Sequence, residues 1–154
     1  MSDHFSGGNL KTAAKLKILD WYLKEYVNII EEHWDEFWYI DTHSGTGKTE
    51  CTNGTLIDGS AIRVLDEYAD KFGRFYFYEV DEDHFHTLHE TLASRFGYDF
   101  DVSEAHPDDA NFLVARNEDP YIRIMQTDSN EGVSFLAEEA SSNPHWFTFV
   151  DPMG

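Results

Sequence analysis

The stretch Phe37-Trp38-Tyr39-Ile40-Asp41-Thr42-His43-Ser44-Gly45-Thr46-Gly47 decides the fold of this 154-residue chain. Its first four residues are aromatic or β-branched and predict a buried strand, and the remainder is a polar turn with two glycines. In an open parallel sheet, ligands bind beyond the carboxyl ends of the strands, where the winding direction switches. The stretch therefore predicts a sheet and marks a place where its ligand site should lie.

Predicted helices and strands alternate on either side of this stretch. The expected helices cover residues 12–32, 60–72, 81–96 and 131–140, and the expected strands cover 37–40, 74–80, 121–125 and 146–150. The helices are indicated by apolar residues at helical spacing, and the strands by short aromatic and β-branched runs. Alternating strands and helices require parallel pairing and right-handed crossovers, so the predicted fold class is α/β, a doubly wound Rossmann-like parallel sheet.

Two connecting segments are less regular in sequence. Largely polar, glycine-containing sequence joins the first strand to Ser60, which is expected to cap the next helix. Residues 97–120 are acidic, contain two prolines, and are interpreted as an insertion with one or two helical turns over residues 110–115.

The chain divides into two parts. Residues 1–35 are expected to form an N-terminal amphipathic helix that packs on the domain, and residues 36–154 the first part of an α/β domain. The chain stops soon after a predicted buried strand, so no following helix covers that part of the sheet. We therefore expect a sheet that is incomplete at the C-terminus, as in the front part of a longer protein.

Acidic residues dominate the composition. The chain has 30 Asp and Glu against 11 Lys and Arg, and its formal charge of −19 disfavours general attraction to nucleic acid or an anionic membrane. Residues 1–24 depart from this pattern, because they hold four lysines against Asp3 and Asp20. An acidic excess of this size keeps a protein hydrated in concentrated salt, where the Debye length falls to ~3 Å at 1 M. It favours a halophilic source, with an ordinary acidic cytosolic protein as the alternative.

Cysteine content and hydropathy indicate the compartment. The single cysteine, Cys51, excludes an internal disulfide and a cysteine-rich metal site. No run approaches the ~20 apolar residues that span a bilayer, and the polar start lacks the apolar stretch of a signal peptide. We therefore expect a cytoplasmic protein without a membrane partner.

Two nucleotide-binding motifs are close to the glycine turn but do not match it. A phosphate-binding P-loop needs a glycine where the chain has Thr42 and a helix that starts at Lys48. A nicotinamide-binding turn needs a third glycine where the chain has Glu50. The turn is instead followed, after a helix, by an acidic residue that closes the second strand. This arrangement suits an adenosine-containing cofactor, because Glu79 can accept hydrogen bonds from both hydroxyls of a ribose.

Residues 41–47 resemble the Asp-x-Phe-Ala-Gly-x-Gly loop of class I S-adenosylmethionine-dependent methyltransferases, with His43 and Ser44 as departures. Three later segments resemble the motifs at the next strand ends of that family, so the resemblance covers most of the chain. These segments are residues 77–81, 128–130 and 149–152.

A narrower resemblance is to the three-Cys-motif partner proteins. It is carried by the lysine-led helix at 15–19, the Tyr-Ile-Asp strand end at 39–41, Gly59-Ser60, the Asp-x-Asn at 128–130 and the closing Asp-Pro-x-Gly. The cysteines in that name belong to the partner, so a single cysteine here is no departure. The resemblance implies a methyltransferase-like protein that acts with a partner protein carrying a three-Cys motif, and nucleic acid is a candidate for the molecule that they modify.

The resemblance also implies roles for single residues. Asp41, Gly45 and Gly47 would hold the methionine end of S-adenosylmethionine. Glu79 would bind its ribose, and Asp81 is the fallback for that role.

The later motifs would complete the site. Asp128 would lie near the adenine with Asn130 beside it, and Asp151 and Pro152 fall where amino-methyltransferases position the target nitrogen. Asp151 and Pro152 are therefore the expected catalytic residues. The next two residues, Met153-Gly154, replace the usual proline and aromatic residue, so a flipped base has no evident stacking platform. This departure leaves a non-catalytic partner, binding the cofactor or another protein, as the alternative.

Histidines and aromatic residues outside these motifs are expected to be structural. His86 and Glu90 have the i, i+4 spacing of a metal pair, but no further ligand is evident, so no metal site is expected. His43 is expected to pack where the family usually has Phe. Three aromatic residues of the first helix are expected to pack rather than to stack on bases: Trp21, Tyr22 and Tyr26.

Overall fold

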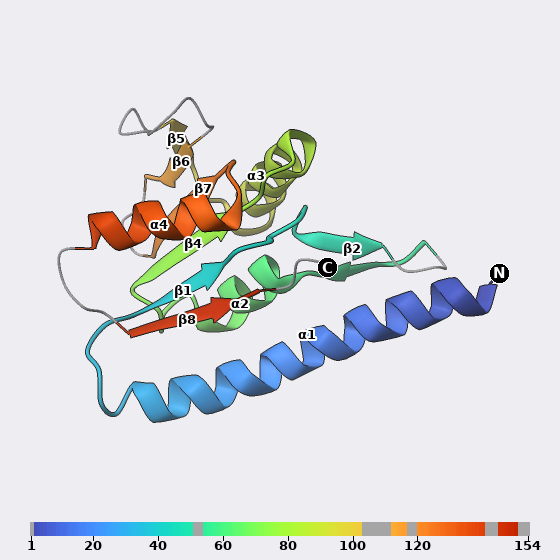
Figure 1. The fold of residues 1–154 in the computed structure, drawn as a ribbon, viewed down its shortest axis with the longest axis horizontal. Coiled ribbons are helices and arrows are strands. Elements are labelled where there is room, and N and C mark those ends of the chain that lie inside the picture. Colours follow the sequence, from blue (N-terminus) through green and yellow to red (C-terminus); the bar gives the residue numbers. More distant parts are fainter. Residues whose placement is uncertain (1, 51–53, 103–111, 117–119, 141–144, 151–154) are drawn as a thin grey trace.

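The computed structural model describes residues 2–50, 54–102, 112–116, 120–140 and 145–150 (Figure 1). The helices of this part of the chain are α1 (Ser2–Ile30), α2 (Ser60–Tyr68), α3 (Glu82–Phe96) and α4 (Ser129–Glu139). The strands are β1 (Phe37–Asp41), β2 (Lys48–Glu50), β3 (Leu56–Asp58), β4 (Arg74–Tyr78), β5 (Phe100–Val102), β6 (Phe112–Ala115), β7 (Tyr121–Met125) and β8 (His145–Phe149).

Six of the strands form one mixed sheet in the order β5-β6-β7-β4-β1-β8. Strands β7, β4, β1 and β8 are parallel, whereas β6 pairs antiparallel with β7 and β5 antiparallel with β6. In chain order the parallel strands are the third, second, first and fourth, so the winding direction switches between β1 and β8. The predicted α/β class is confirmed, and the sheet is mostly parallel and compatible with a Rossmann-like fold.

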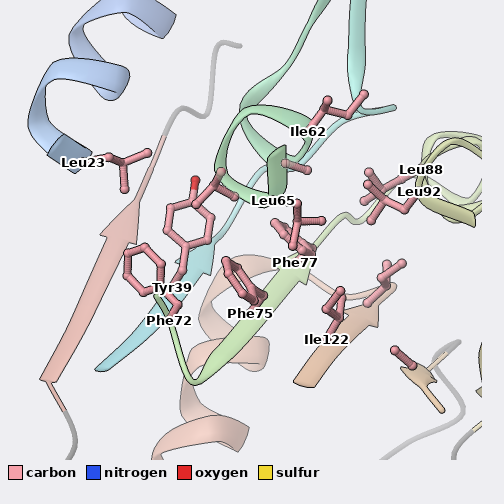
Figure 2. Packing of buried hydrophobic residues seen from close by; sticks show 14 of the residues in the cluster. Leu23, Tyr39, Ile62, Leu65, Phe72, Phe75, Phe77, Leu88, Leu92 and Ile122 are labelled. Atoms are coloured by element: carbon pink, nitrogen blue, oxygen red, sulfur yellow. The ribbon is translucent and has the colours of Figure 1, made fainter. Parts of the chain in front are cut away.

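Side chains alternate between the two faces of the sheet and build a core on each face. On one face Phe75 and Phe77 pack with buried residues of α1, α2 and α3, and Figure 2 shows side chains of these helices and strands meeting in one layer. On the other face Tyr76 and Tyr78 pack with Leu136 of α4. Because helices cover both faces, the parallel strands are nearly continuous apolar runs.

Helix α1 packs along the first face through Leu16, Leu19, Leu23 and Val27, of which none is more than 5% exposed. The four residues recur at helical spacing, so they form one stripe on the helix. The helix begins at Ser2, earlier than the expected residue 12. No helix in the described part of the chain combines the length and apolar character that crossing a bilayer requires.

The exposed side of α1 corrects one expectation. Trp21 and Tyr22 are 59% and 55% exposed, so the prediction that they pack in the helix is wrong. Trp21 projects from the side of α1 opposite to the buried stripe and Tyr22 from its flank, and their two rings contact each other edge-on with centroids 5.1 Å apart. Tyr26 does pack, because its ring is stacked on that of Phe72 with centroids 6.1 Å apart.

Two antiparallel strand pairs, β2 with β3 and β5 with β6, are not expected from the sequence. Strands β2 and β3 pair between β1 and α2, within the polar segment that leads to Ser60. Phe112 and Leu113 belong to β6, so the helical turns expected over residues 110–115 are wrong for the described residues 112–115. Pairing with β7 decides this outcome, because it buries both side chains against the sheet.

The start of α2 also differs from expectation. Its N-cap is Gly59, which makes no side-chain capping bond, and Ser60 is the first helical residue. The capping role predicted for Ser60 is therefore wrong. Its hydroxyl donates instead to the carboxylate of Asp41, across the connection between β1 and α2.

Gly132 of α4 lies against the ring of Tyr78 in the sheet, so a substitution at Gly132 can show how closely the helix packs there. A Cβ at this position would come within 3.0 Å of the ring of Tyr78, which is fully buried. Replacing glycine by alanine in an exposed helix interior stabilises by ~1 kcal/mol, but overpacking a core costs ~1–3 kcal/mol. We expect Gly132→Ala to lower the free energy of unfolding by ~1–2 kcal/mol, measured by urea denaturation in molar potassium chloride. An unchanged or higher free energy would contradict the close packing of α4 on Tyr78.

Candidate functional site

The loop that follows β1 lies between the ends of the two neighbouring strands. The backbone N–H of Thr42 donates to the carbonyl of Phe149 in β8 over 3.1 Å, and that of Ser44 donates to the carbonyl of Tyr78 in β4 over 3.0 Å. Both strands are parallel to β1, so their carboxyl ends meet at this loop. The ligand position expected for a doubly wound sheet thus coincides with residues 41–47.

Both glycines of the loop have backbone angles that other residues rarely adopt. The angle φ is 65° at Gly45 and 90° at Gly47. A Cβ on Gly47 would lie 3.3 Å from Leu88 and Thr91 of α3, whereas a Cβ on Gly45 would meet no described atom within 4 Å. Gly47 is therefore needed for packing of the loop on α3, and Gly45 leaves open space where a ligand can approach the backbone.

Asp41, the last residue of β1, has a fully buried carboxylate. It accepts hydrogen bonds from the hydroxyl of Ser60 and, over 3.3 Å, from the backbone N–H of His43. The hydroxyl of Tyr39 donates to the same carboxylate over 3.5 Å. Burial raises the pKa of Asp41 from 3.8 to about 6, and these hydrogen bonds oppose the rise. Asp41 thus ties the loop to the start of α2.

Glu79 follows β4 and joins the same loop from the other side. One carboxylate oxygen accepts the backbone N–H of Gly45 and the other accepts that of Asp81, each over 3.0 Å. Each oxygen has two lone pairs, so both retain one for a ligand. The carboxylate of Asp81 instead accepts the N–H of His84 and caps α3. The structure therefore places Glu79, and not its fallback Asp81, against the glycine loop.

A cavity of about 90 Å³ opens beside the loop. Its wall contains loop residues 43–47, together with Leu16 of α1, Lys48 of β2, Ser60 of α2 and Phe149 of β8. Elements far apart in the sequence thus enclose this cavity.

His43 lies half-buried in this wall. Its Nδ1 is 2.7 Å from the hydroxyl of Thr42, and that hydroxyl is also 3.2 Å from the carbonyl of Phe149. The imidazole is therefore held in place by a polar neighbour while it borders the cavity.

The end of β7 is joined to the end of β4, but not directly to the cavity. The N–H of Glu79 donates to the carbonyl of Met125 over 3.1 Å. Asp128 is exposed and caps α4 by accepting the N–H of Glu131 over 2.9 Å, and Asn130 is exposed in the first turn of that helix. Among the described contacts, none links Asp128 or Asn130 to residues 42–47. These two residues lie at the expected strand end without reaching the loop.

The two residues expected to be catalytic, Asp151 and Pro152, lie outside the described residues. The strand that leads to them is described. Strand β8 pairs with β1 from Phe37↔His145 to Asp41↔Phe149, so residue 150 follows directly beyond the loop end of β1.

The histidines of α3 do not form a metal site. His86 lies 3.8 Å from Glu82, one turn earlier, and the ring of His89 packs edge-on against Phe100. Within the described ranges, no group of three or more His, Cys, Asp or Glu residues is arranged to hold a metal ion.

Ser60 is the residue of this site that sequence reasoning missed. The sequence suggested a helix-capping role for it and a place in the Gly59-Ser60 resemblance but no contact with Asp41, because that contact spans 19 positions of the chain. No family model, curated protein or solved structure matches this chain.

Asp41 predicts a specific pH dependence of stability. Its pKa is about 6 in the folded protein against 3.8 for the ordinary side chain, so the folded state binds the proton more tightly. The contribution of Asp41 protonation to the free energy of unfolding is therefore largest below pH 4, and it is lost as the pH rises through 6. We expect the stability of Asp41→Asn relative to the natural protein to rise between pH 4 and 7 by about 3 kcal/mol, since one pKa unit corresponds to ~1.4 kcal/mol. Urea denaturation across this range measures the difference, and parallel curves would contradict a buried, titrating Asp41.

Proposed function

We propose that this chain binds S-adenosylmethionine at the ends of β1 and β4 and belongs to the class I methyltransferase type. The proposal rests above all on the hydrogen bond from Gly45 to Glu79, which joins the glycine loop to the acidic residue of the next parallel strand. In a doubly wound sheet this pair of features flanks the switch point, where an adenosine-containing ligand binds. No P-loop or nicotinamide motif competes for the loop.

The residues at the site fit such a ligand. Glu79 retains a lone pair on each oxygen for the two ribose hydroxyls. The open space at Gly45 allows close approach to the backbone, and the cavity beside it has room for the amino-acid end. In this proposal Asp41 and Gly47 shape that end of the site, and Asp128 and Asn130 lie toward the adenine, one strand further along the sheet.

The chemistry required of the protein is mainly alignment. S-adenosylmethionine supplies a methyl group activated by its sulfonium. Methyl transfer then depends on holding a nucleophile in line with that group, and alignment alone can contribute ~7–11 kcal/mol to catalysis. In this proposal Asp151 and Pro152, which follow β8 in the sequence, orient the acceptor.

Protein binding is favoured by a separate observation. Ile18, Trp21, Tyr22 and Ile29 of α1 are each more than half exposed. These residues recur on one side of α1, and a contiguous exposed apolar patch is typical of a protein-interaction surface. We therefore propose that the chain acts with a partner protein, as the three-Cys-motif resemblance implies, and a non-catalytic partner is the second candidate function.

Substitution of Glu79 tests whether its carboxylate binds the ribose of the cofactor. Glu79→Ala removes two charge-assisted hydrogen bonds to the ribose, so we expect affinity for S-adenosylhomocysteine to fall by ~1.5–3 kcal/mol. Calorimetry in molar potassium chloride measures the affinity. Asp81→Ala is the matched control and should bind as the natural protein does, because Asp81 caps α3. Equal affinity of the natural protein and Glu79→Ala would remove the ribose assignment.

Asp151 separates the enzyme from the non-catalytic partner. If Asp151 contacts only the acceptor, Asp151→Ala should keep cofactor affinity and abolish methyl transfer. The measurement is incorporation of labelled methyl into nucleic acid and protein, with the partner protein present and at high salt. Undiminished transfer by Asp151→Ala would refute its role, and no transfer by the natural protein would favour the non-catalytic partner.

A further inference from the structure

Helix α1 carries a second stripe of regular spacing on its exposed side. Five exposed residues recur there at alternating steps of three and four positions: Lys15, Ile18, Tyr22, Glu25 and Ile29. This is the spacing of the contact positions in a coiled coil, where about two side chains in every seven face the other helix. The three apolar members are each more than half exposed. This exposed stripe is therefore a face of the kind that another helix covers.

The exposed stripe is accessible and continues onto the sheet edge. In Figure 1 α1 runs along one margin of the molecule, and the sheet and the other helices lie together on its far side. Next to the stripe, Ile18 and Tyr22 line a hollow of about 480 Å³ with Phe147 and Val150 at β8. Val150 is also more than half exposed. The apolar surface thus extends beyond a single helix, as at a protein interface.

The two charged members of the stripe decide which helix fits it. If two copies of α1 lie antiparallel, Lys15 of each copy can meet Glu25 of the other. In the same register Ile18 of each copy meets Tyr22 of the other, because both pairs are centred on position 20. A parallel pair would instead oppose Lys15 to Lys15 and Glu25 to Glu25. The stripe is therefore complementary to itself in the antiparallel orientation.

We propose that a second copy of this chain covers the exposed stripe, in a two-fold symmetric dimer with antiparallel α1 helices. A two-fold interface uses the same patch on both copies, so that patch must match itself. The inference rests on the protein contact proposed for α1 and deepens it, because it names the protein that makes the contact. A partner protein with a three-Cys motif then binds another surface of the dimer. Trp21, whose ring centroid is 5.1 Å from that of Tyr22, flanks the stripe near the two-fold axis.

The charge of the chain gives the dimer a definite salt dependence. Each copy has a formal charge of −19, so two copies repel each other in dilute salt. In molar salt the Debye length is ~3 Å, and this long-range repulsion is screened while the apolar contacts remain. We expect sedimentation equilibrium of the natural chain to show a dimer that tightens as potassium chloride rises from dilute to molar. A natural chain that is monomeric throughout would refute the dimer.

Charge exchange tests the orientation of the two helices. Lys15→Glu opposes two carboxylates at each end of the interface, and Glu25→Lys opposes two ammonium groups. We expect each variant to weaken the dimer about 10-fold at the lowest salt at which the natural chain dimerises, since exposed ion pairs are weak and two are reversed. The double variant keeps the formal charge of −19 and should restore the natural affinity. Lys17→Glu, exposed on α1 outside the stripe, is the matched control and should dimerise nearly as the natural chain does.

A second variant tests the apolar centre of the interface. Ile18→Asp places an unpaired carboxylate there in both copies, so it should leave only monomer. Its circular dichroism should be unchanged, because Ile18 is exposed in the single chain. A dimer that persists in Ile18→Asp, or charge-exchange variants that all behave like Lys17→Glu, would refute the antiparallel contact.

The outcomes also separate this inference from the proposals on which it rests. If the natural chain is monomeric but binds a three-Cys-motif partner, and Ile18→Asp blocks that binding, the second copy is refuted and the protein contact of α1 stands. If the natural chain binds neither a second copy nor such a partner, both fall. Affinity for S-adenosylhomocysteine, measured by calorimetry on the same samples, tests the cofactor proposal separately.

Discussion

The parallel pairing of β1 with β4 on one side and β8 on the other is the constraint on which the rest of the structure depends. It makes β1 the strand at which the winding direction switches, so the loop after it meets two strand ends at once. Thr42 is bonded to β8 and Ser44 to β4, and the two glycines then turn the chain back over α3. A different neighbour for β1 would remove the cavity, because Phe149 would no longer form its wall.

The buried Asp41 shows that this loop is not arranged for stability alone. Burying a carboxylate is unfavourable, as its raised pKa indicates, and an apolar residue would avoid that cost. Bonds from Ser60 and from the His43 backbone compensate in part, and they also fix the loop relative to α2. A carboxylate with a raised pKa at a strand end beside a cavity is typical of a functional site.

Sequence reasoning located the parallel strands because each is a short aromatic or β-branched run with polar residues at its end. It located Asp41, Gly45, Gly47 and Glu79 for the same reason, since these residues lie at strand ends. It missed the two hairpins, because β2 is largely polar and β6 owes its form to pairing with β7 rather than to local preference. It also misassigned Ser60, whose partner is fixed by tertiary packing, and no spacing rule connects α2 to the end of β1.

The charge of the chain explains why selection would depend on contacts inside the cavity. With a formal charge of −19, the protein attracts cations of every kind at low salt. In molar salt the Debye length is ~3 Å, so this long-range attraction is screened and carries no selectivity. Groups shielded from the solvent are screened much less, and beside this cavity they include the buried hydroxyls of Ser44 and Ser60 and the carboxylate of Asp41 behind them. In molar salt, selectivity would therefore come from buried, hydrogen-bonded groups such as the carboxylate of Asp41, and not from the carboxylates on the surface.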